Sequence, residues 1–374
     1  MNLDFSEEQE MLREMVRSLC TEHAGIDVVR AMEDDPMGYP ADLWKQLGEV
    51  ELLGILIPEE FGGAGMNMLD AAVVYEELGR SLAPSPHFVS CVLAAGAILE
   101  AGDEEQKKEW LPRLASGDAI ISPAWLEPGN GYGPKGVQLR AQAEGDEFVL
   151  TGTKLHCLFA SSASRLLVLA RTGEGLSDID LFLVDPEAAG VSLEQQMSLA
   201  SDTQYKIDLE GTRVPASARL GAAGGGWAAW NRVMHDGIIL AAAQAMGGAQ
   251  RALDITCEYA SEREQFDKPL AAFQSISHYL ADAATQVSGG TTLVYEAAWA
   301  RSEGKDTARL APMAKLFACQ IYRDLTAMSL QVFGGVGFTI EYDAQLFFRR
   351  AKQLQLSWWD TPYLEELVAS SILD

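Results

Sequence analysis

The hydrophobic pattern of this 374-residue chain changes its period twice. Helical spacing begins after Ser6, a predicted N-cap with Gln9 three residues later, and continues to about residue 118. Short apolar runs bounded by Gly, Asp, Pro and Ser follow, as is typical of strands. These runs are Val137–Ala143, Phe148–Thr151, Leu166–Ala170, Ile179–Val184 and Tyr205–Leu209. Helical spacing then returns in Ile238–Arg263, Phe273–Glu303 and Ala311–Phe333. The pattern therefore predicts a small β domain over 119–220, between two helical parts.

Composition excludes several classes of partner. Hydrophobic residues make up 48% of the chain, which is ample for large cores. Fifty-four acidic residues against 28 basic ones give a formal charge of −26, which repels nucleic acid and anionic lipid. The first ten residues, MNLDFSEEQE, lack the basic and apolar regions of a signal peptide, and no apolar run reaches the roughly 20 residues of a membrane span. We therefore expect a cytoplasmic protein that binds neither nucleic acid nor membranes.

The cysteines and histidines indicate no metal site. The five cysteines are odd in number and scattered without ligand spacing, which predicts reduced packing residues: Cys20, Cys91, Cys157, Cys257 and Cys319. The five histidines also lack ligand spacing, and the chain has no Gly-x-Ser-x-Gly motif. Metalloenzyme and serine hydrolase functions therefore have no support in the sequence.

Two predicted helix ends carry groups that could bind a ligand. Arg263 lies in Ser261–Phe266, where an arginine is also favourable simply because it interacts with the helix dipole. Gln331–Gly337 contains glycines that could end a helix or let a ligand approach the backbone. This glycine segment is not a dinucleotide-binding fingerprint, because that motif follows a strand and this one follows a predicted helix.

The order of these motifs resembles that of the acyl-CoA dehydrogenase family, and the resemblance covers essentially the whole chain. The matching segments are Ile57–Gly65, Leu126–Pro128, Gly152–Lys154, Arg263–Phe266, Phe273–Gln274, Gln331–Phe338 and Arg350–Lys352. The resemblance implies an α+β, mainly α fold with three domains: an N-terminal helical domain (1–118), a middle β-barrel-like domain (119–220) and a C-terminal four-helix bundle (221–374). It also implies noncovalent FAD at a subunit interface.

In that family an acyl-CoA thioester is oxidised to the trans-2-enoyl-CoA. A carboxylate removes the α-proton while a hydride passes from the β-carbon to the flavin, so the cofactor supplies the redox chemistry and the protein supplies the base. The resemblance further implies contacts to the ADP half of a FAD whose flavin lies on the neighbouring subunit. The matching residues are Arg263, Gln265, Phe266, Gln274, Gln331, Gly334 and Gly335.

The flavin half of the family site is depleted in this sequence. Family members usually carry Thr-Glu-Pro with a following Gly-Ser, and Trp-Ile-Thr after Gly-x-Lys. Here Leu126 replaces the threonine, Gly129–Gly133 lacks the serine, and His156-Cys157-Leu158 stands where the aromatic residue and threonine should fall. Donors for a flavin of its own are therefore reduced.

The family's catalytic carboxylate is also missing. The resemblance places the usual glutamate at Trp358, and the alternative glutamate of a minority of members at Gly237. The nearest carboxylates are Asp360, two residues later, and Asp236, one residue earlier on its helix. Aspartate is one methylene shorter, and one helical residue rotates a side chain by about 100°, so a structural role is favoured for both. Bulky Trp358 and Trp359 would instead fill space used by the substrate.

Three functions remain open. In the first, the chain is the non-catalytic subunit of a heterotetrameric acyl-CoA dehydrogenase and completes the FAD site of a second chain. Glu341–Lys352 resembles the subgroup that acts on steroid side-chain CoA thioesters. In the second, it is a self-sufficient homotetramer that uses Asp360 or Asp236. In the third, it is a scaffold without FAD, which the retained ADP-binding positions disfavour. An electron-transferring flavoprotein is the acceptor that the family suggests.

Overall fold

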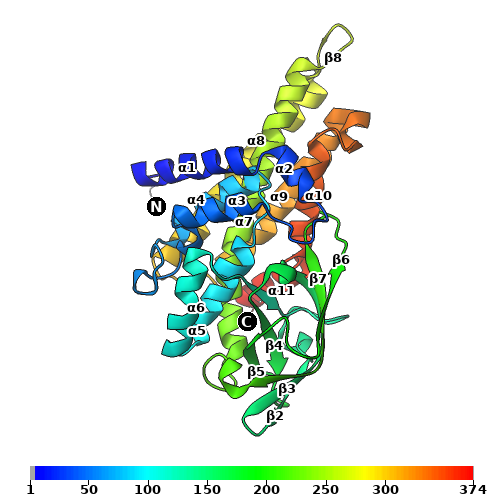
Figure 1. Ribbon diagram of the computed structural model, residues 1–374. Coiled ribbons are helices and arrows are strands. Elements are labelled where there is room, and N and C mark those ends of the chain that lie inside the picture. Colours follow the sequence, from blue (N-terminus) through cyan, green and yellow to red (C-terminus); the bar gives the residue numbers. More distant parts are fainter. Residues whose placement is uncertain (1–4, 374) are drawn as a thin grey trace. The chain divides into compact units, whose positions relative to one another are not determined.

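The computed structural model describes residues 5–373 (Figure 1). These residues divide into two compact units. The helical unit runs up to Arg30, includes Asn67–Ala83 and resumes at Ile238. The sheet unit comprises Ala31–Met66 and Pro84–Gly237. The long helix α7 (Gly226–Glu262) contributes residues to both units.

The helical unit consists of long helices with one short hairpin. Besides the C-terminal part of α7, its elements are α1 (Glu7–His23), α2 (Ile26–Ala31), α4 (Met68–Arg80), the hairpin β8 (Glu264–Gln265) and β9 (Lys268–Pro269), α8 (Gln274–Ser302), α9 (Leu310–Phe333), the 3₁₀ turn η8 (Gly334–Phe338), α10 (Ala344–Leu356) and α11 (Thr361–Leu373). Helix α9 contacts α8, α10 and α11. It therefore forms the centre of the C-terminal helical bundle.

Helix α1 begins at the capping box that the sequence predicts. The Ser6 hydroxyl accepts a hydrogen bond from Gln9 N, and the Gln9 side chain accepts one from Ser6 N, at 3.2 and 3.1 Å. Each bond satisfies a backbone donor that the first helical turn leaves free. Farther along, Arg17 donates two hydrogen bonds to the buried Glu77 carboxylate of α4, at 2.9 and 2.6 Å. These bonds fix α1 against α4.

Helices α4 and α7 approach so closely that glycine is required at the contact. A Cβ atom on Gly247 of α7 would lie 1.8 Å from the carbonyl oxygen of Glu76. A Cβ on Gly79 of α4 would lie 2.0 Å from the carbonyl oxygen of Gln244. The two glycines therefore let the helix backbones touch, a contact that alanine would prevent.

The sheet unit surrounds one curled sheet with short helices. Its helices are α3 (Ala41–Glu49), the π-helix η3 (Phe88–Ala94), α5 (Ala95–Ala101) and α6 (Glu104–Ser116). Its strands are β1 (Ile121–Ala124), β2 (Arg140–Glu144), β3 (Glu147–Leu158), β4 (Arg165–Arg171), β5 (Ile179–Val184), β6 (Val191–Gln196) and β7 (Gln204–Pro215). The strand order is β1-β4-β2-β3-β7-β6, with β5 paired to β4. Most pairs are antiparallel, but β4 runs parallel to β1 and β2.

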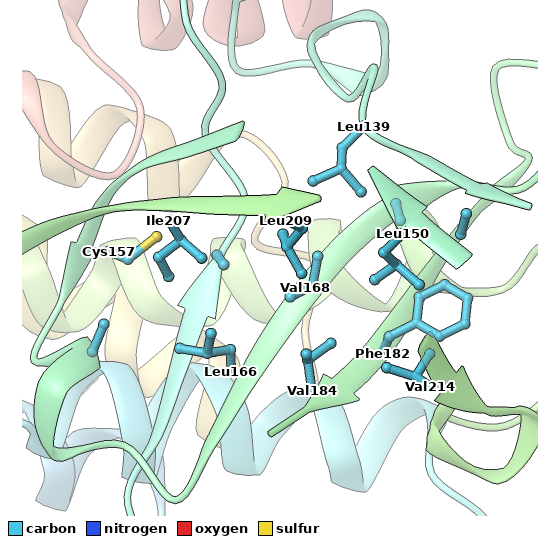
Figure 2. Close-up of a cluster of buried hydrophobic side chains, with 14 of the residues drawn as sticks. Leu139, Leu150, Cys157, Leu166, Val168, Phe182, Val184, Ile207, Leu209 and Val214 are labelled. Atoms are coloured by element: carbon cyan, nitrogen blue, oxygen red, sulfur yellow. The ribbon is translucent and has the colours of Figure 1, made fainter. Parts of the chain in front are cut away.

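Apolar side chains of the sheet form a contiguous core, shown in Figure 2. Leu150 of β3, Val168 of β4 and Phe182 of β5 are all fully buried in it. Every residue of β5 and nearly every residue of β4 is buried, which explains why these strands read as continuous apolar runs. The core therefore supports β3, whose far end carries candidate site residues.

The structure confirms a mainly helical α+β fold with its sheet in the middle of the sequence. It also contains β1 and β6, which the hydrophobic pattern did not predict. Strand β1 has four residues with Pro123 among them, and β6 is only partly buried, so neither gives a clear strand signal. The three domain boundaries stay a prediction. Within residues 5–373, no helix is long and apolar enough to cross a bilayer.

Candidate functional site

The end of α7 presents the first group of predicted cofactor residues. Arg263 directly follows the helix, and its backbone N–H donates to the carbonyl of Tyr259 at 2.8 Å. Its side chain is exposed, and within residues 5–373 the guanidinium makes no ion pair. The positive charge is therefore available to an external anion.

The hairpin after Arg263 extends beyond the helix end (Figure 1). Its two turn residues, Phe266 and Asp267, have φ values of 55° and 61°, the left-handed conformation of a tight two-residue hairpin turn. Phe266 is 88% exposed, and its ring contacts the edge of Phe273 at a centroid distance of 6.2 Å. Lys268 Nζ lies 4.1 Å from the Phe273 ring centroid. The hairpin thus carries an exposed aromatic ring beside positive charge. Gln265, next to the turn, and Gln274, at the start of α8, are also exposed.

The end of α9 presents the second group. Gln331 lies exposed in its last turn, and Gly334 follows the helix with φ 66° and ψ −140°, a conformation that is open to glycine alone. A Cβ atom on Gly334 or Gly335 would meet nothing within 4 Å. Glycine is therefore needed at 334 for its backbone conformation, and both positions leave backbone accessible.

An aromatic contact joins these two helix ends. The Tyr259 ring stacks on the Phe333 ring with centroids 4.3 Å apart and planes 20° apart. The edge of Tyr342 contacts both rings. Because Arg263 is one turn beyond Tyr259 and Gly334 directly follows Phe333, the structure brings the two predicted segments to adjacent helix ends. The sequence motifs gave no sign of this link.

In the sheet unit, Glu127 organises the loop where the family resemblance places flavin contacts. Its carboxylate accepts hydrogen bonds from the backbone N–H groups of Gln138 and Leu139 at 3.0 Å, and from Lys154 Nζ at 2.7 Å. Lys154 is fully buried, and this burial lowers its pKa, while the Glu127 charge acts in the opposite direction. The buried pair therefore fixes Leu126–Pro128 against β3.

His156 occupies a bulge in β3 next to this loop. Leu155 N donates to the carbonyl of Leu126 at 2.9 Å, which places His156 beside the loop. His156 has φ 56°, and its Nδ1 lies 2.9 Å from Gln204 Oε1. The next residue, Cys157, is fully buried, and burial raises the pKa of its thiol to about 12. The cysteine thus packs in the core, and only the imidazole is exposed.

Three aromatic side chains fill the space behind the same loop. The ring of Trp125 lies 5.5 Å from that of Trp230 and 5.8 Å from that of Tyr132, between centroids. Trp230 is fully buried, and its Nε1 has no hydrogen-bond partner within residues 5–373. Tyr132 lies in the Gly129–Gly133 segment, which lacks the family serine, and its ring fills part of this space.

Asp360, the first candidate base, is the N-cap of α11. Its Oδ1 accepts a hydrogen bond from Tyr363 N at 3.1 Å, and its carbonyl accepts one from Leu364 N at 3.0 Å. The preceding Trp358 and Trp359 have φ values of 54° and 72°, and Trp359 is fully buried. The carboxylate therefore already has a structural role in starting a helix.

Asp236, the second candidate, lies within α7 in the sheet unit. At the adjacent Gly237, a Cβ atom would lie 2.7 Å from Leu93 Cδ2 and 3.4 Å from Phe88 Cζ. Leu93 is fully buried in the π-helical segment. A side chain at the position of the alternative family glutamate would therefore require Leu93 to move.

Comparison with known proteins gives the family. The model described as "Acyl-CoA dehydrogenase, N-terminal domain" matches residues 6–118, and "Acyl-CoA dehydrogenase, C-terminal domain" matches residues 224–357. The chain belongs to the acyl-CoA dehydrogenase family. A relative in Bacillus subtilis (strain 168), "Probable acyl-CoA dehydrogenase YngJ", is 32% identical and aligns over 100% of both chains.

Two solved structures of the acyl-CoA dehydrogenase fold are instructive. One is the ChsE4–ChsE5 complex from Mycobacterium tuberculosis, with 26% identity, a TM-score of 0.90 and coverage of 100% of this chain and 99% of the other. The other is a glutaryl-CoA dehydrogenase from Mycobacterium smegmatis in complex with FADH2, with 26% identity, a TM-score of 0.91 and coverage of 99% and 95%. Family membership and this second neighbour indicate FAD as the cofactor.

The two halves of the family's FAD site differ in how well they fit that cofactor. The helix-end segments offer an exposed guanidinium, side-chain amides and open glycine backbone, which suit the pyrophosphate and the rest of the ADP half. The Leu126–Gly133 loop instead has Leu126 in place of the family threonine and lacks the family serine, and its Glu127 carboxylate already accepts hydrogen bonds from Lys154, Gln138 and Leu139. The roles of the seven predicted cofactor residues and of both aspartates stay predictions.

Proposed function

We propose that this acyl-CoA dehydrogenase chain is the non-catalytic subunit of a heteromeric enzyme. It lends its helix-end segments to the ADP half of a FAD whose flavin, base and acyl pocket belong to a second chain. When bound, FAD supplies the hydride acceptor for α,β-dehydrogenation of an acyl-CoA thioester. The residues of this chain bind and orient the nucleotide tail and transfer no proton.

The observation that supports this proposal most directly is the hydrogen bond by which the Asp360 carboxylate caps α11. A general base must have its carboxylate free to reach the substrate proton, but the Asp360 carboxylate accepts from the first turn of α11. Removing it from that cap to act as a base would cost about 0.5–2 kcal/mol of helix stability. Its capping role therefore favours a structural aspartate.

The alternative base position supports the same conclusion. A glutamate at position 237 would require the Leu93 side chain to move, since its Cβ would lie 2.7 Å from the leucine Cδ2. Val233, one turn earlier on α7, also packs closely, because a Cβ on Gly96 would lie 3.2 Å from Val233 Cγ1. Helix α7 and the η3–α5 segment thus pack closely at this position, and a catalytic side chain here would need neighbouring side chains to move.

The heteromeric assembly is supported by likeness to the ChsE4–ChsE5 complex, which contains two different chains. The segment Glu341–Lys352 resembles the steroid side-chain subgroup, so a steroid side-chain CoA thioester is the substrate class that we propose for the complex. A second acyl-CoA dehydrogenase chain is then the obligatory partner, and an electron-transferring flavoprotein is the proposed electron acceptor.

A self-sufficient homotetramer is the second candidate function. Its support is the full-length match to single-chain relatives such as the Bacillus subtilis protein, which has 32% identity over the whole chain. In this case Asp360 or Asp236 would act as the base, after a backbone adjustment at either position.

Flavin stoichiometry separates the two functions. The chain is purified alone and after co-expression with the product of a neighbouring acyl-CoA dehydrogenase gene, and FAD is quantified by its absorbance after denaturation. The heteromeric enzyme should contain one FAD per pair of unlike chains, and the isolated chain should be colourless. One FAD per chain in the isolated protein, together with dehydrogenase turnover, would instead establish the homotetramer.

A further inference from the structure

Lys315 is a fully buried cation that contacts backbone carbonyl groups. It lies in the middle of α9, and its Nζ donates hydrogen bonds to the carbonyls of Trp359 at 2.9 Å and Leu354 at 3.2 Å. Among residues 5–373 it has no carboxylate within ion-pair distance. A buried ammonium with only dipolar partners is costly, so its retention needs a specific reason.

The two carbonyls belong to the two sides of one turn. Leu354 lies in the last turn of α10, where carbonyl groups lack intrahelical partners, and Trp359 directly precedes the N-cap of α11. A positive charge at the C-terminal end of α10 also interacts favourably with the helix dipole. Lys315 therefore links the end of one helix to the start of the next.

The charge environment of Lys315 is defined by two further groups. Burial lowers the pKa of Lys315, while its electrostatic interactions with Cys319 and Asp360 act in the opposite direction. Cys319, one turn along α9, also contacts the Leu354 carbonyl, with its Sγ at 3.9 Å. The ammonium thus contacts backbone carbonyl groups, and the carboxylate that caps α11 attracts it from beyond ion-pair distance.

The turn that Lys315 spans is strained. Trp358 and Trp359 are consecutive left-handed residues, with φ values of 54° and 72°, and bulky side chains rarely adopt this conformation. The Trp359 ring packs against Tyr363 at a centroid distance of 5.4 Å. Such a backbone persists only when surrounding contacts hold it in place, and the two Lys315 hydrogen bonds are contacts of this kind.

We propose that Lys315 is the positioning residue of the Ser357–Asp360 turn and thereby determines where residue 358 is presented. This inference deepens the proposed function and rests on it, because residue 358 matters as the position where the family carries its base. In this chain Lys315 holds Trp358 and Trp359 in that place and keeps the Asp360 carboxylate on the helix cap.

Hydrogen–deuterium exchange of the complex tests this role. Lys315→Met removes the ammonium and keeps the length of the side chain, and Arg323→Met removes an exposed charge from the same helix as a matched control. We expect Lys315→Met to speed exchange in peptides covering 354–364 by about tenfold or more, with α8 unchanged, and the control to have no effect. Unchanged exchange at 354–364, or an equal increase throughout α8 and α9, would overturn the proposal.

A second substitution that relieves the backbone strain at residue 358 distinguishes the positioning role of Lys315 from a general role in packing. Glycine tolerates the left-handed conformation of residue 358, so Trp358→Gly added to Lys315→Met should restore much of the protection at 354–364. Failure of the double variant to regain protection would contradict the role of Lys315 in holding a strained turn.

If Lys315→Met does not fold, the unmodified complex still provides a test. With lysine labelled at its side-chain nitrogen, NMR should show protected ammonium signals for both buried lysines, Lys154 and Lys315, and only the Lys315 signal should be coupled to the carbonyls of Leu354 and Trp359. Absence of the Lys315 signal would overturn the proposed role of Lys315 in positioning the turn. FAD stoichiometry of the same samples reports separately on the proposed function, so the two failures can be told apart.

Discussion

The ring of Tyr259 stacks on the ring of Phe333 at 4.3 Å between centroids, and its hydroxyl donates to the Phe333 carbonyl at 3.5 Å. This contact joins the end of α7 to the end of α9, which lie far apart in the sequence. A small apolar cluster of Leu330, Phe333 and Ala344 surrounds it. The Tyr259–Phe333 pair therefore helps to fix the relative positions of Arg263 and Gly334, together with the Thr256–Ser329 hydrogen bond between the same two helices.

Removing the Tyr259 ring should separate these two segments. Tyr259→Leu should destabilise the chain by about 0.5–1.5 kcal/mol beyond its lost burial, because a stacked aromatic pair is lost. The FAD content of the complex should also fall. Urea unfolding measures the change in stability, and flavin absorbance measures the FAD content. Tyr259→Phe keeps the ring and should retain nearly normal FAD. Equal FAD loss in both variants would show that the hydroxyl, not stacking, is what matters.

The two adjacent glycines should respond differently to alanine. Gly334→Ala forces a side chain into φ 66°, ψ −140°, which should cost about 1–3 kcal/mol. Gly335→Ala is the matched control, because position 335 has equal space and no positive φ. Thermal unfolding of both variants tests this, and an equal loss of stability at the two positions would contradict it.

Replacing Arg263 with alanine should lower the FAD content of the complex. A charge-assisted hydrogen bond to phosphate is worth about 1.5–3 kcal/mol, so FAD affinity should fall roughly 10- to 100-fold. Arg251→Ala, which removes an exposed arginine paired with Glu258 on the same helix, serves as the control. Isothermal titration of the FAD-free complex measures both affinities, and an unchanged FAD affinity in Arg263→Ala would remove this residue from the site.

Asp360→Ala should affect stability and leave turnover nearly unchanged. Losing the N-cap of α11 should cost about 0.5–2 kcal/mol, whereas Asp360→Asn keeps an oxygen that can cap the helix and should be nearly neutral. Denaturant midpoints and steady-state turnover of the complex report the two effects. A large loss of turnover in both variants, with FAD retained, would assign the base to this chain.

His87 should make stability depend on pH in the acid range. It is fully buried, its Nε2 lies 2.9 Å from the Leu52 carbonyl, and burial lowers its pKa from 6.5 to about 4. Between these values the unfolded chain binds a proton that the folded chain does not, so stability falls as the pH drops from about 6.5 to 4. The free energy of unfolding lost through protonation of His87 is up to about 3 kcal/mol.

A variant without this imidazole isolates the effect of His87. In His87→Gln, the difference in denaturant-unfolding free energy between pH 7 and pH 4.5 should be smaller than in the unmodified chain. An identical pH dependence in the two proteins would mean that groups other than His87 cause the loss of stability at low pH.

Local sequence determined the features that need only near neighbours. The capping box at Ser6 and Gln9, the end of α9 before Gly334 and the apolar runs of β4 and β5 depend on periodicity and on residues a few positions apart. The family motifs added the predicted cofactor residues and the absence of both usual glutamates. Lys315 could have been noticed as a lone charge on the otherwise apolar face of α9, although its partners could not have been named.

Only the tertiary structure decided which distant segments meet. It paired Tyr259 with Phe333, placed Lys315 against the carbonyls of Leu354 and Trp359, and used Asp360 to cap α11. These contacts depend on how helices pack and on where each chain reversal directs the backbone. Such long-range geometry follows from the whole chain's burial and hydrogen bonding, which the spacing of residues in one segment does not encode.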